Sequence, residues 1–335
     1  MARLNQESSW RLAGRFGLAA SARVGSAYLR PMRRHLLSVP FLCALFLVPQ
    51  PALAWLAPGH MATGAIAYDA LERQDPAAVA AIVGVEQAHP DHARFEQVLG
   101  ATQGGARDRK LFELMARWPD DARRGPYDHP DWHYSEKIQS SLRYVLPFAW
   151  GRARSAYLRE LAIARDPKAA AADRAVALCW VLHIIGDMHE PEHAGLWMSL
   201  RFPVTDEAGN AAWVRTSAAM RPEKLHWLWD SAGAEDPDAA RRRDADAFAA
   251  SLEAEHPAPT ISRTDNAARD YDRWVDETRQ IARHVAYRDG ALRLGTTPET
   301  AAILPPDYVQ EVQTVADARL ALAGYRTAEV LQGLR

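Results

Sequence analysis

The segment from Arg165 to Pro191 places polar residues within a nearly continuous apolar helix, and it constrains the fold more than any other feature. It has an acidic, Ala-rich start, continues as LCWVLHIIG, and stops at Pro191, which cannot extend a helix. A helix that is apolar nearly all round belongs at the centre of a fold. His183 and Asp187 stand four residues apart, so their side chains project from one face. They require partners there, because unpaired polar groups are costly to bury.

The rest of the chain after Gly59 also predicts helices. Ala, Leu and Arg are frequent, and no long run alternates β-branched and polar residues. Residues 267–285 and 309–334 each repeat apolar side chains at steps of three and four. The loops that contain Pro and Gly are too short to be linkers, and no internal repeat is present. We therefore predict an all-α, single-domain, multi-helix fold.

Residues 32–54 have the organisation of a signal peptide. Arg33 and Arg34 form a basic start, LLSVPFLCALFLV is an apolar run, and PALA ends at Ala54 as a small-residue cleavage site. The apolar run is too short and wrongly flanked for a spanning helix, although an uncleaved signal anchor is the alternative. Residues 1–31 are either an upstream-start extension or a long n-region. We expect a secreted or periplasmic protein that begins at Trp55, with no stable membrane insertion.

The charge balance restricts how this chain could bind a polyanion. Removing residues 1–54 takes seven Arg and one Glu from 40 basic and 42 acidic residues, which leaves 33 and 41 and a formal charge of −8. A broad basic face for nucleic acid is therefore not expected, and any phosphate affinity must be local. Only Cys179 remains, so no internal disulfide can form. Nothing in the sequence indicates an obligate protein partner.

Two further features extend the polar pair on the central helix. His226 and Asp230 form a second pair at the same spacing inside LHWLWD, and His193 follows Pro191. One such pair alone is more typical of a hydrogen-bonded core histidine. Two pairs in apolar, Trp-rich surroundings, with His193 between them, favour metal, because imidazole and carboxylate are ligands of Zn²⁺.

The start of the mature chain adds one more ligand type. Trp55 would present a free α-amine, which a metal can hold unprotonated, and His60 follows in WLAPGH. With HIIGDMHEPEH and LHWLWDS, these residues make the chain resemble the S1/P1 nuclease family of the phospholipase C/P1 nuclease superfamily. The resemblance extends over residues 55–335, the expected catalytic domain. It also includes WPDDAR, with Asp120 and Arg123, and DWHYSE, with His133.

The resemblance implies a trinuclear zinc cleft and a nuclease activity. One zinc would be held by Asp120, His133, His183 and Asp187, a second by His193, His226 and Asp230, and a third by Trp55, His60 and the shared Asp187. The implied enzyme is a zinc-dependent, single-strand-specific endonuclease and 3′-nucleotidase. It would act on single-stranded DNA, RNA and 3′-nucleotides, with 5′-phosphate products from the nucleic acids. Asp120 would orient the attacking water, and Arg123 would stabilise the pentacoordinate transition state.

Several positions depart from the family pattern. Glu136 replaces an Asp that fixes the arginine, and it is one methylene longer. Tyr134 replaces an aromatic residue, often Phe, that resembles a base-stacking wall. Asn210 in EAGN resembles a base-recognition Asn, although Ala stands where the family has Gly. Glu190 and Glu192 replace Gln and Leu, which adds negative charge beside an incoming phosphate.

Two other classes of protein remain as alternatives. A zinc-dependent phospholipase C is similar in its N-terminal Trp and central helix. The short spacing from Trp55 to His60 and the final Asp230 in place of Glu favour the nuclease. The second alternative is a noncatalytic periplasmic protein that binds zinc or nucleotides on the same scaffold. All expected ligands and Arg123 are present, which favours an enzyme.

Overall fold

The structure is a computed structural model that describes residues 55–142, 149–234, 236–261 and 264–335. The predicted signal peptide and residues 1–31 lie outside these ranges. The α-helices in the described residues are α1 (Ala57–Gln74), α2 (Pro76–Glu86), α3 (His92–Leu99), α4 (Gly104–Asp121), α5 (Ala153–Arg165), α6 (Ala171–Asp187), α7 (Leu225–Asp230), α8 (Pro237–Arg241), α9 (Ala245–Glu255), α10 (Ala267–Ile281) and α11 (Pro306–Leu331). None of these helices is both long and apolar enough to cross a membrane.

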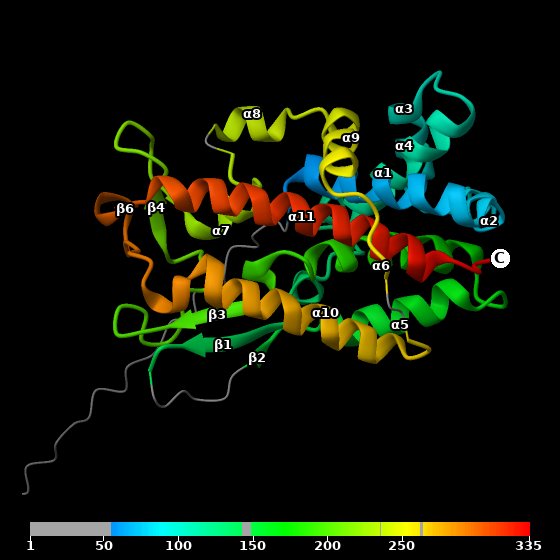
Figure 1. Cartoon of the computed structure of the whole chain (residues 1–335). Helices are drawn as coiled ribbons and strands as arrows, with labels where there is room; N and C mark the ends of the chain where they lie inside the picture. The colour runs from blue at the N-terminus through cyan, green and yellow to red at the C-terminus, as the bar shows by residue number, and fades with distance from the viewer. Residues whose placement is uncertain (1–54, 143–148, 235, 262–263) are drawn as a thin grey trace, which may run out of the picture. The chain divides into compact units, whose positions relative to one another are not determined.

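Short strands and tight helical turns connect the helices (Figure 1). The strands are β1 (Glu136–Ser140), β2 (Ala149–Trp150), β3 (Gly195–Met198), β4 (Trp213–Arg215), β5 (Glu223–Lys224) and β6 (Ala302–Ile303). The turns are the 3₁₀ helices η1 (Pro130–His133), η2 (Pro191–His193), η4 (Arg288–Gly290) and η5 (Pro298–Thr300), and the π-helix η3 (Ala282–Ala286).

The predicted helical class is confirmed, with two small sheets added to it. One sheet has the order β2-β1-β3, in which β1 is antiparallel to β2 and parallel to β3. The other has the order β5-β4-β6, in which β4 is antiparallel to β5 and parallel to β6. None of the strands is longer than five residues, so sequence alternation could not reveal them.

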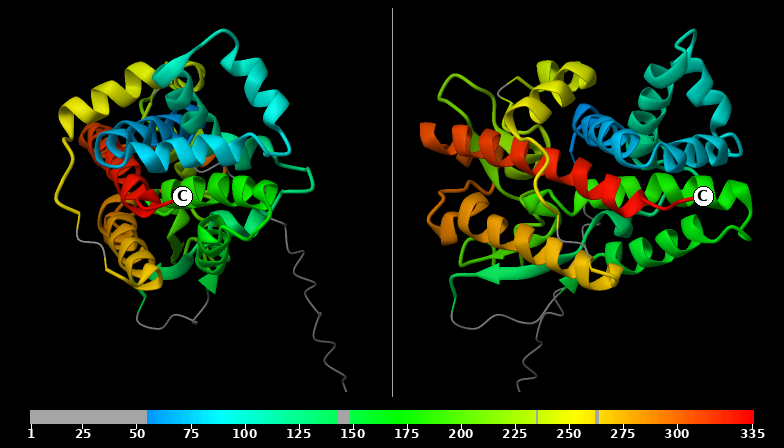
Figure 2. Two further views of the ribbon diagram at one scale, coloured as in Figure 1. Left: turned by 90° about the vertical axis from the view of Figure 1, so that its right-hand side faces the viewer. Right: turned by 45° about the vertical axis from the view of Figure 1, so that its right-hand side comes forward.

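Helix α1 packs closely against α4 and α11, as Figure 2 shows. A Cβ atom at Gly64 of α1 would lie 2.4 Å from the carbonyl oxygen of Phe112 in α4. A Cβ at Gly324 of α11 would lie 2.6 Å from the Cβ of Ile66 in α1. Only glycine therefore permits these backbones to approach so closely. The close packing fixes α1, and with it His60, against the centre of the molecule.

Helix α6 is buried as its sequence predicts. Every residue from Ala177 to Asp187 is buried. The helix ends at Asp187, earlier than the predicted stop at Pro191, and the chain then turns through η2. The predicted helix over residues 267–285 likewise ends at Ile281 and continues as the π-helix η3.

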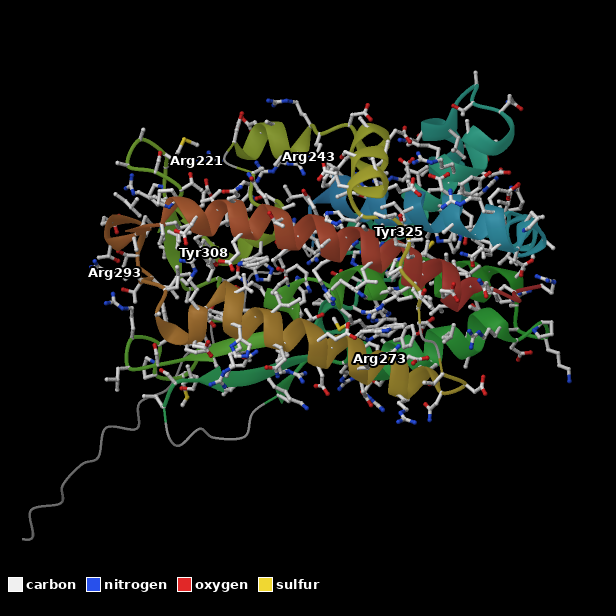
Figure 3. The ribbon with its side chains drawn as sticks, in the orientation of Figure 1. Arg221, Arg243, Arg273, Arg293, Tyr308 and Tyr325 are labelled. Carbon is white, nitrogen blue, oxygen red and sulfur yellow. The ribbon has the colours of Figure 1, made fainter. Side chains whose placement is uncertain are left out.

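A second apolar cluster supports the short helix α7. Trp229 of α7 is fully buried, and its indole N–H donates to the hydroxyl of Tyr308 at 3.2 Å. Tyr308, labelled in Figure 3, is itself fully buried and donates to the carbonyl oxygen of Ala286 at 2.8 Å. A six-residue helix is marginal alone, so this anchoring of Trp229 sets the orientation of α7 and of the His226 and Asp230 side chains on it.

Candidate metal centre

The structure brings the histidines and carboxylates predicted from the sequence into two adjacent groups. The first group, on α1, α4, η1 and α6, consists of His60, Asp120, His133, His183 and Asp187. The second group, on η2 and α7, consists of His193, His226 and Asp230, together with Glu190, the residue before η2. All of these side chains are buried except Asp120, which is 9% exposed.

Asp187 lies at the centre of the first group. Its Oδ1 is 3.4 Å from His60 Nε2, and its Oδ2 is 3.4 Å from His183 Nε2 and 3.0 Å from His133 Nδ1. The Asp120 oxygens lie 3.8 Å from His60 Nε2 and 3.9 Å from His183 Nε2. Tetrahedral zinc with bonds of about 2.0–2.2 Å places its ligand atoms roughly 3.3–3.6 Å apart. These separations are close to that range, and the two Asp187 oxygens face different histidines, as a bridging carboxylate would.

Backbone carbonyls set the tautomers of three histidines. The Nδ1 atoms of His183, His193 and His226 lie 2.8, 2.7 and 2.5 Å from the carbonyl oxygens of Ala116, His133 and Ala208. A carbonyl oxygen only accepts, so each Nδ1 carries the proton and each neutral ring keeps its lone pair on Nε2. A hydrogen bond from the ring nitrogen that does not bind the metal is what orients a metal-binding histidine. Burial also lowers the pKa values of His60, His133, His183 and His193, which keeps these rings neutral.

The second group contains a carboxylate that was not among the predicted ligands. His226 Nε2 lies 3.4 Å from Asp230 Oδ2, and His193 Nε2 lies 4.0 Å from Glu190 Oε2. Glu190 is fully buried and precedes His193 by three residues. That spacing is the only sequence signal for it, because the turn that directs both side chains inward was not predicted.

The buried polar atoms of both groups fit divalent cations. Asp187 Oδ1, Asp230 Oδ1, His193 Nε2 and both ring nitrogens of His60 have no hydrogen-bond partner within the described part of the chain. Burial, followed by neighbouring carboxylates, raises the pKa values of Asp187 and Asp230 well above their ordinary range. Such groups are costly to bury unless they are paired or coordinate a metal. Imidazole and carboxylate donors at these separations are the ligand set of zinc.

The start of the described chain lies beside both groups. Trp55 is fully buried, and its indole N–H donates to the carbonyl oxygen of Gly186 at 3.0 Å, next to Asp187. The backbone N–H of Leu56 donates to the carbonyl oxygen of Asp230 at 2.9 Å. The Trp55 backbone is thus held between α6 and α7, close to the two carboxylates.

Arg123 and Tyr134 lie at the less buried edge of the centre. The Nε and Nη2 atoms of Arg123 donate to Asp120 Oδ1 at 3.0 and 2.8 Å, and the arginine side chain is 14% exposed. The ring of Tyr134 stacks on His193 with 4.5 Å between centroids and 21° between planes. Both predicted substrate-contacting groups therefore border the ligand side chains.

Glu136 is buried at the start of β1, where burial and the nearby Asp206 and Glu190 raise its pKa. Its contact with Arg123 stays a prediction.

Asn210 is partly buried, and its amide donates to the carbonyl oxygen of Glu207 at 3.1 Å. It follows three residues with left-handed backbone, Glu207, Ala208 and Gly209 (φ 55°, 53° and 74°), and Ala208 supplies the carbonyl that holds His226.

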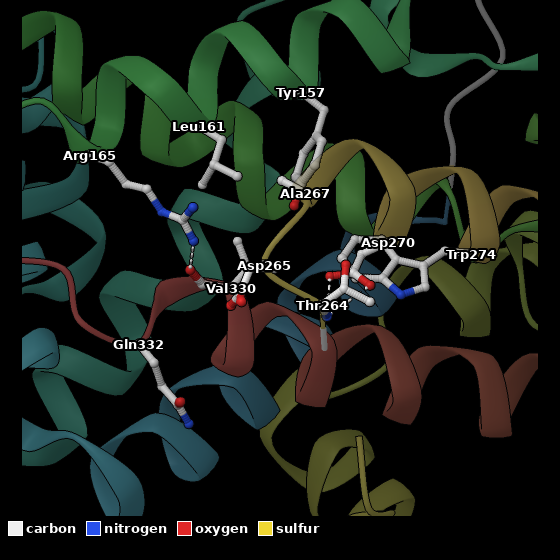
Figure 4. Close-up of a pocket in the computed structure, with 10 residues that line it drawn as sticks. All are labelled: Tyr157, Leu161, Arg165, Thr264, Asp265, Ala267, Asp270, Trp274, Val330 and Gln332. Carbon is white, nitrogen blue, oxygen red and sulfur yellow. Dashed lines mark hydrogen bonds between the residues drawn. The ribbon is translucent and has the colours of Figure 1, made fainter. Parts of the chain in front are cut away.

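The pocket in Figure 4 is a different feature. It is lined by residues of α5, α10, α11 and the segments before α10 and after α11, and Arg165 donates there to the carbonyl oxygen of Val330 at 2.8 Å. Its lining contains none of the histidines of the metal centre. We therefore locate the functional site at the two ligand groups.

A comparison with known families agrees with the geometry of these groups. The sequence profile of the S1/P1 Nuclease family matches residues 55–334, so the chain belongs to this family. Members are zinc-dependent, and the protein is accordingly a hydrolase with nuclease or phosphodiesterase activity that acts on nucleic acid. The search of curated proteins returned no match.

Proposed function

We propose that the protein is an exported endonuclease that hydrolyses single-stranded DNA and RNA to 5′-phosphate products and removes the phosphate of 3′-nucleotides. Its cofactor would be three zinc ions per chain. The observation that carries the proposal is the convergence of buried, partnerless ligand atoms on Asp187 and Asp230, with the histidine tautomers set for coordination.

The ligand assignment is the one that the family resemblance implies, and the distances in the first and second groups support it. Asp120, His133, His183 and Asp187 would hold one zinc, and His60, Asp187 and the α-amine of Trp55 a second. His193, His226 and Asp230 would hold the third. Bound zinc lowers the pKa of a water ligand and neutralises phosphate oxygens, which also lets an acidic protein attract a polyanion.

The side chains around the metals would position the substrate. Asp120 Oδ2 accepts a hydrogen bond from the attacking water and aims it at phosphorus. Arg123 is held by Asp120 Oδ1, and its guanidinium donates to the phosphate as negative charge develops. Tyr134 would stack a base and Asn210 would contact it, while Glu136 would act on Arg123. Single strands suit such a site because an unpaired base exposes its ring face.

Export is part of the proposal because the Trp55 ligand requires a free amine. Removal of a signal peptide after Ala54 would create that amine at the point where the Trp55 backbone lies between α6 and α7. A matched pair of chains tests this, one beginning at Trp55 and one with a single residue before it. We expect the longer chain to lose one zinc and most activity, and equal activity of the two would refute the assignment.

The test of the function measures zinc per chain and hydrolysis in one sample. The substrates are single- and double-stranded DNA, RNA, a 3′-nucleotide and phosphatidylcholine. We expect three zincs, 5′-phosphate ends from single strands and intact lipid. Lipid hydrolysis would instead favour a phospholipase C, and bound zinc without turnover would favour a binding protein.

A further inference from the structure

We propose that Glu190 is a fourth protein ligand of the metal site formed by His193, His226 and Asp230. This inference rests on the proposed zinc centre and adds a residue that the family ligand set does not contain. Glu190 is fully buried, and its Oε2 accepts the backbone N–H of His193 at 2.8 Å. Its Oε1 has no hydrogen-bond partner in the described ranges.

The side chains around Glu190 fit a cation. One ligand atom from each of Glu190, His193, His226 and Asp230 lies within 4.8 Å of the others. His193 and His226 direct Nε2 toward the group, because the Nδ1 of each faces a carbonyl oxygen. One divalent cation would neutralise the carboxylates of both Glu190 and Asp230. Two buried carboxylates that faced each other without it would be strongly destabilising.

The arrangement also distinguishes this site from the site formed by Trp55, His60 and Asp187, which has three protein ligands. Two imidazoles and two carboxylates complete four-coordinate zinc, which is typical of closed, tightly held sites. Three protein ligands would leave a position open for water or a phosphate oxygen. Glu190 therefore makes this zinc more firmly held than a zinc with three protein ligands, and a phosphate oxygen binds there only by displacing the Glu190 carboxylate or by adding a fifth ligand.

The test uses Glu190→Gln, with Glu192→Gln as the matched control. Glu192 is also a fully buried carboxylate near η2, but its Oε2 accepts from the hydroxyl of Tyr287 and it belongs to neither ligand group. Metal-free protein is titrated with zinc against a competing chelator. We expect E190Q to weaken one site by at least about tenfold and E192Q to leave every site within about threefold.

Melting temperatures separate a ligand from a hydrogen-bonded structural residue. If Glu190 is a ligand, E190Q lowers the melting temperature of the zinc-loaded protein much more than that of the metal-free protein, because only the zinc-loaded protein loses a bond to the metal. E192Q shifts both forms in the same direction. A Glu190 that only accepts the His193 N–H would shift both forms by similar amounts on substitution, and that result would overturn the proposal.

A second variant tests the proposal if E190Q does not fold. Glu190→Asp keeps the charge but shortens the side chain by one methylene, so it is expected to weaken the same zinc site. Wild-type zinc affinity in E190D would count against the ligand role, as would unchanged affinity in a folded E190Q. These measurements use no nucleic acid, so a wild-type protein that binds zinc but cleaves nothing would contradict the proposed function and leave this inference standing.

Discussion

Two buried clusters in the described part of the chain contain metal-binding residue types, and they differ in the direction of a hydrogen bond to a histidine. The metal centre is the first. The second, which we call the α2 cluster, consists of Glu86 at the end of α2, His89 just after it, and Cys179 on α6. All three side chains are buried, and one ligand atom of each lies within 4.8 Å of the others. By residue type and proximity alone, both clusters would qualify as zinc sites.

The backbone around His89 argues against metal in the α2 cluster. The backbone N–H of Asp91 donates to His89 Nδ1 at 3.0 Å, so the proton of the neutral ring is on Nε2. That nitrogen has no lone pair to give a metal. His89 also stacks on Phe95 with 4.8 Å between ring centroids and meets Trp118 edge-on at 4.5 Å. At His183 the Nδ1 faces a carbonyl oxygen, and the lone pair is on Nε2.

The comparison shows that the backbone group hydrogen-bonded to Nδ1 of a buried histidine determines whether its Nε2 can bind a metal. A carbonyl oxygen on Nδ1 leaves Nε2 ready for a cation, whereas an N–H group on Nδ1 makes Nε2 a donor. His89 therefore serves packing, and its hydrogen bonds give the physical reason.

The largest predicted difference comes from removing one carboxylate from each cluster. Asp187→Asn is expected to reduce the zinc content by two and to lower kcat/KM by about a thousandfold or more, or roughly 4 kcal/mol of transition-state stabilisation, because Asp187 bridges two sites. Glu86→Gln should leave zinc content and kcat/KM unchanged. Zinc analysis and single-strand hydrolysis check both variants. Loss of zinc from E86Q would contradict the conclusion that the α2 cluster binds no metal.

Arg123 tests whether metal binding and turnover can be separated within the metal centre. Arg123→Ala is expected to lower kcat by about 100- to 1,000-fold, because it removes donors to the developing phosphate charge. Its zinc content should stay at the wild-type value, since no ligand is lost. Arg124→Ala, at the exposed neighbouring residue, serves as the control and should match the wild type. An R123A protein that loses zinc in proportion to activity would assign Arg123 a structural role.

Much of the helical fold and of the ligand set was predictable, because it is encoded locally. His183 with Asp187, and His226 with Asp230, share a helix face at a spacing of four residues. That His60 would stack on His183, with 4.1 Å between ring centroids, depends on how α1 packs against its neighbours and is not local. Glu190 was noted only as an added charge, because the turn at η2 was not predicted. The hydrogen bond that sets the tautomer of His89 could not be predicted either.

The pH dependence of stability tests whether His89 of the α2 cluster stays neutral in the folded protein. Burial lowers the pKa of His89 to about 4, below its ordinary value of 6.5. As the pH falls from 6.5 to 4, the unfolded chain binds a proton at this residue and the folded chain does not. His89 therefore lowers the free energy of unfolding by up to roughly 3 kcal/mol over this range. His89→Gln should flatten the pH dependence of chelated protein in urea unfolding, and parallel curves would contradict the assignment.

The smallest effect is expected from the loop that holds His226. Ala208 has φ of 53°, a left-handed conformation that favours glycine. Ala208→Gly is therefore expected to raise the free energy of unfolding by up to about 1 kcal/mol. Ala232→Gly, with φ of 52° just after α7, should give a similar gain. A destabilised A208G, the usual result of replacing alanine by glycine, would show that this backbone is unstrained.

The most direct test of the account is an anomalous difference map, recorded at the zinc absorption edge from crystals of the chain that begins at Trp55. We predict three zinc peaks, two beside Asp187 and one among His193, His226, Asp230 and Glu190, and none at Cys179. A zinc peak between Glu86, His89 and Cys179, or the absence of peaks beside Asp187, would contradict the conclusion that hydrogen-bond direction separates the metal centre from the α2 cluster.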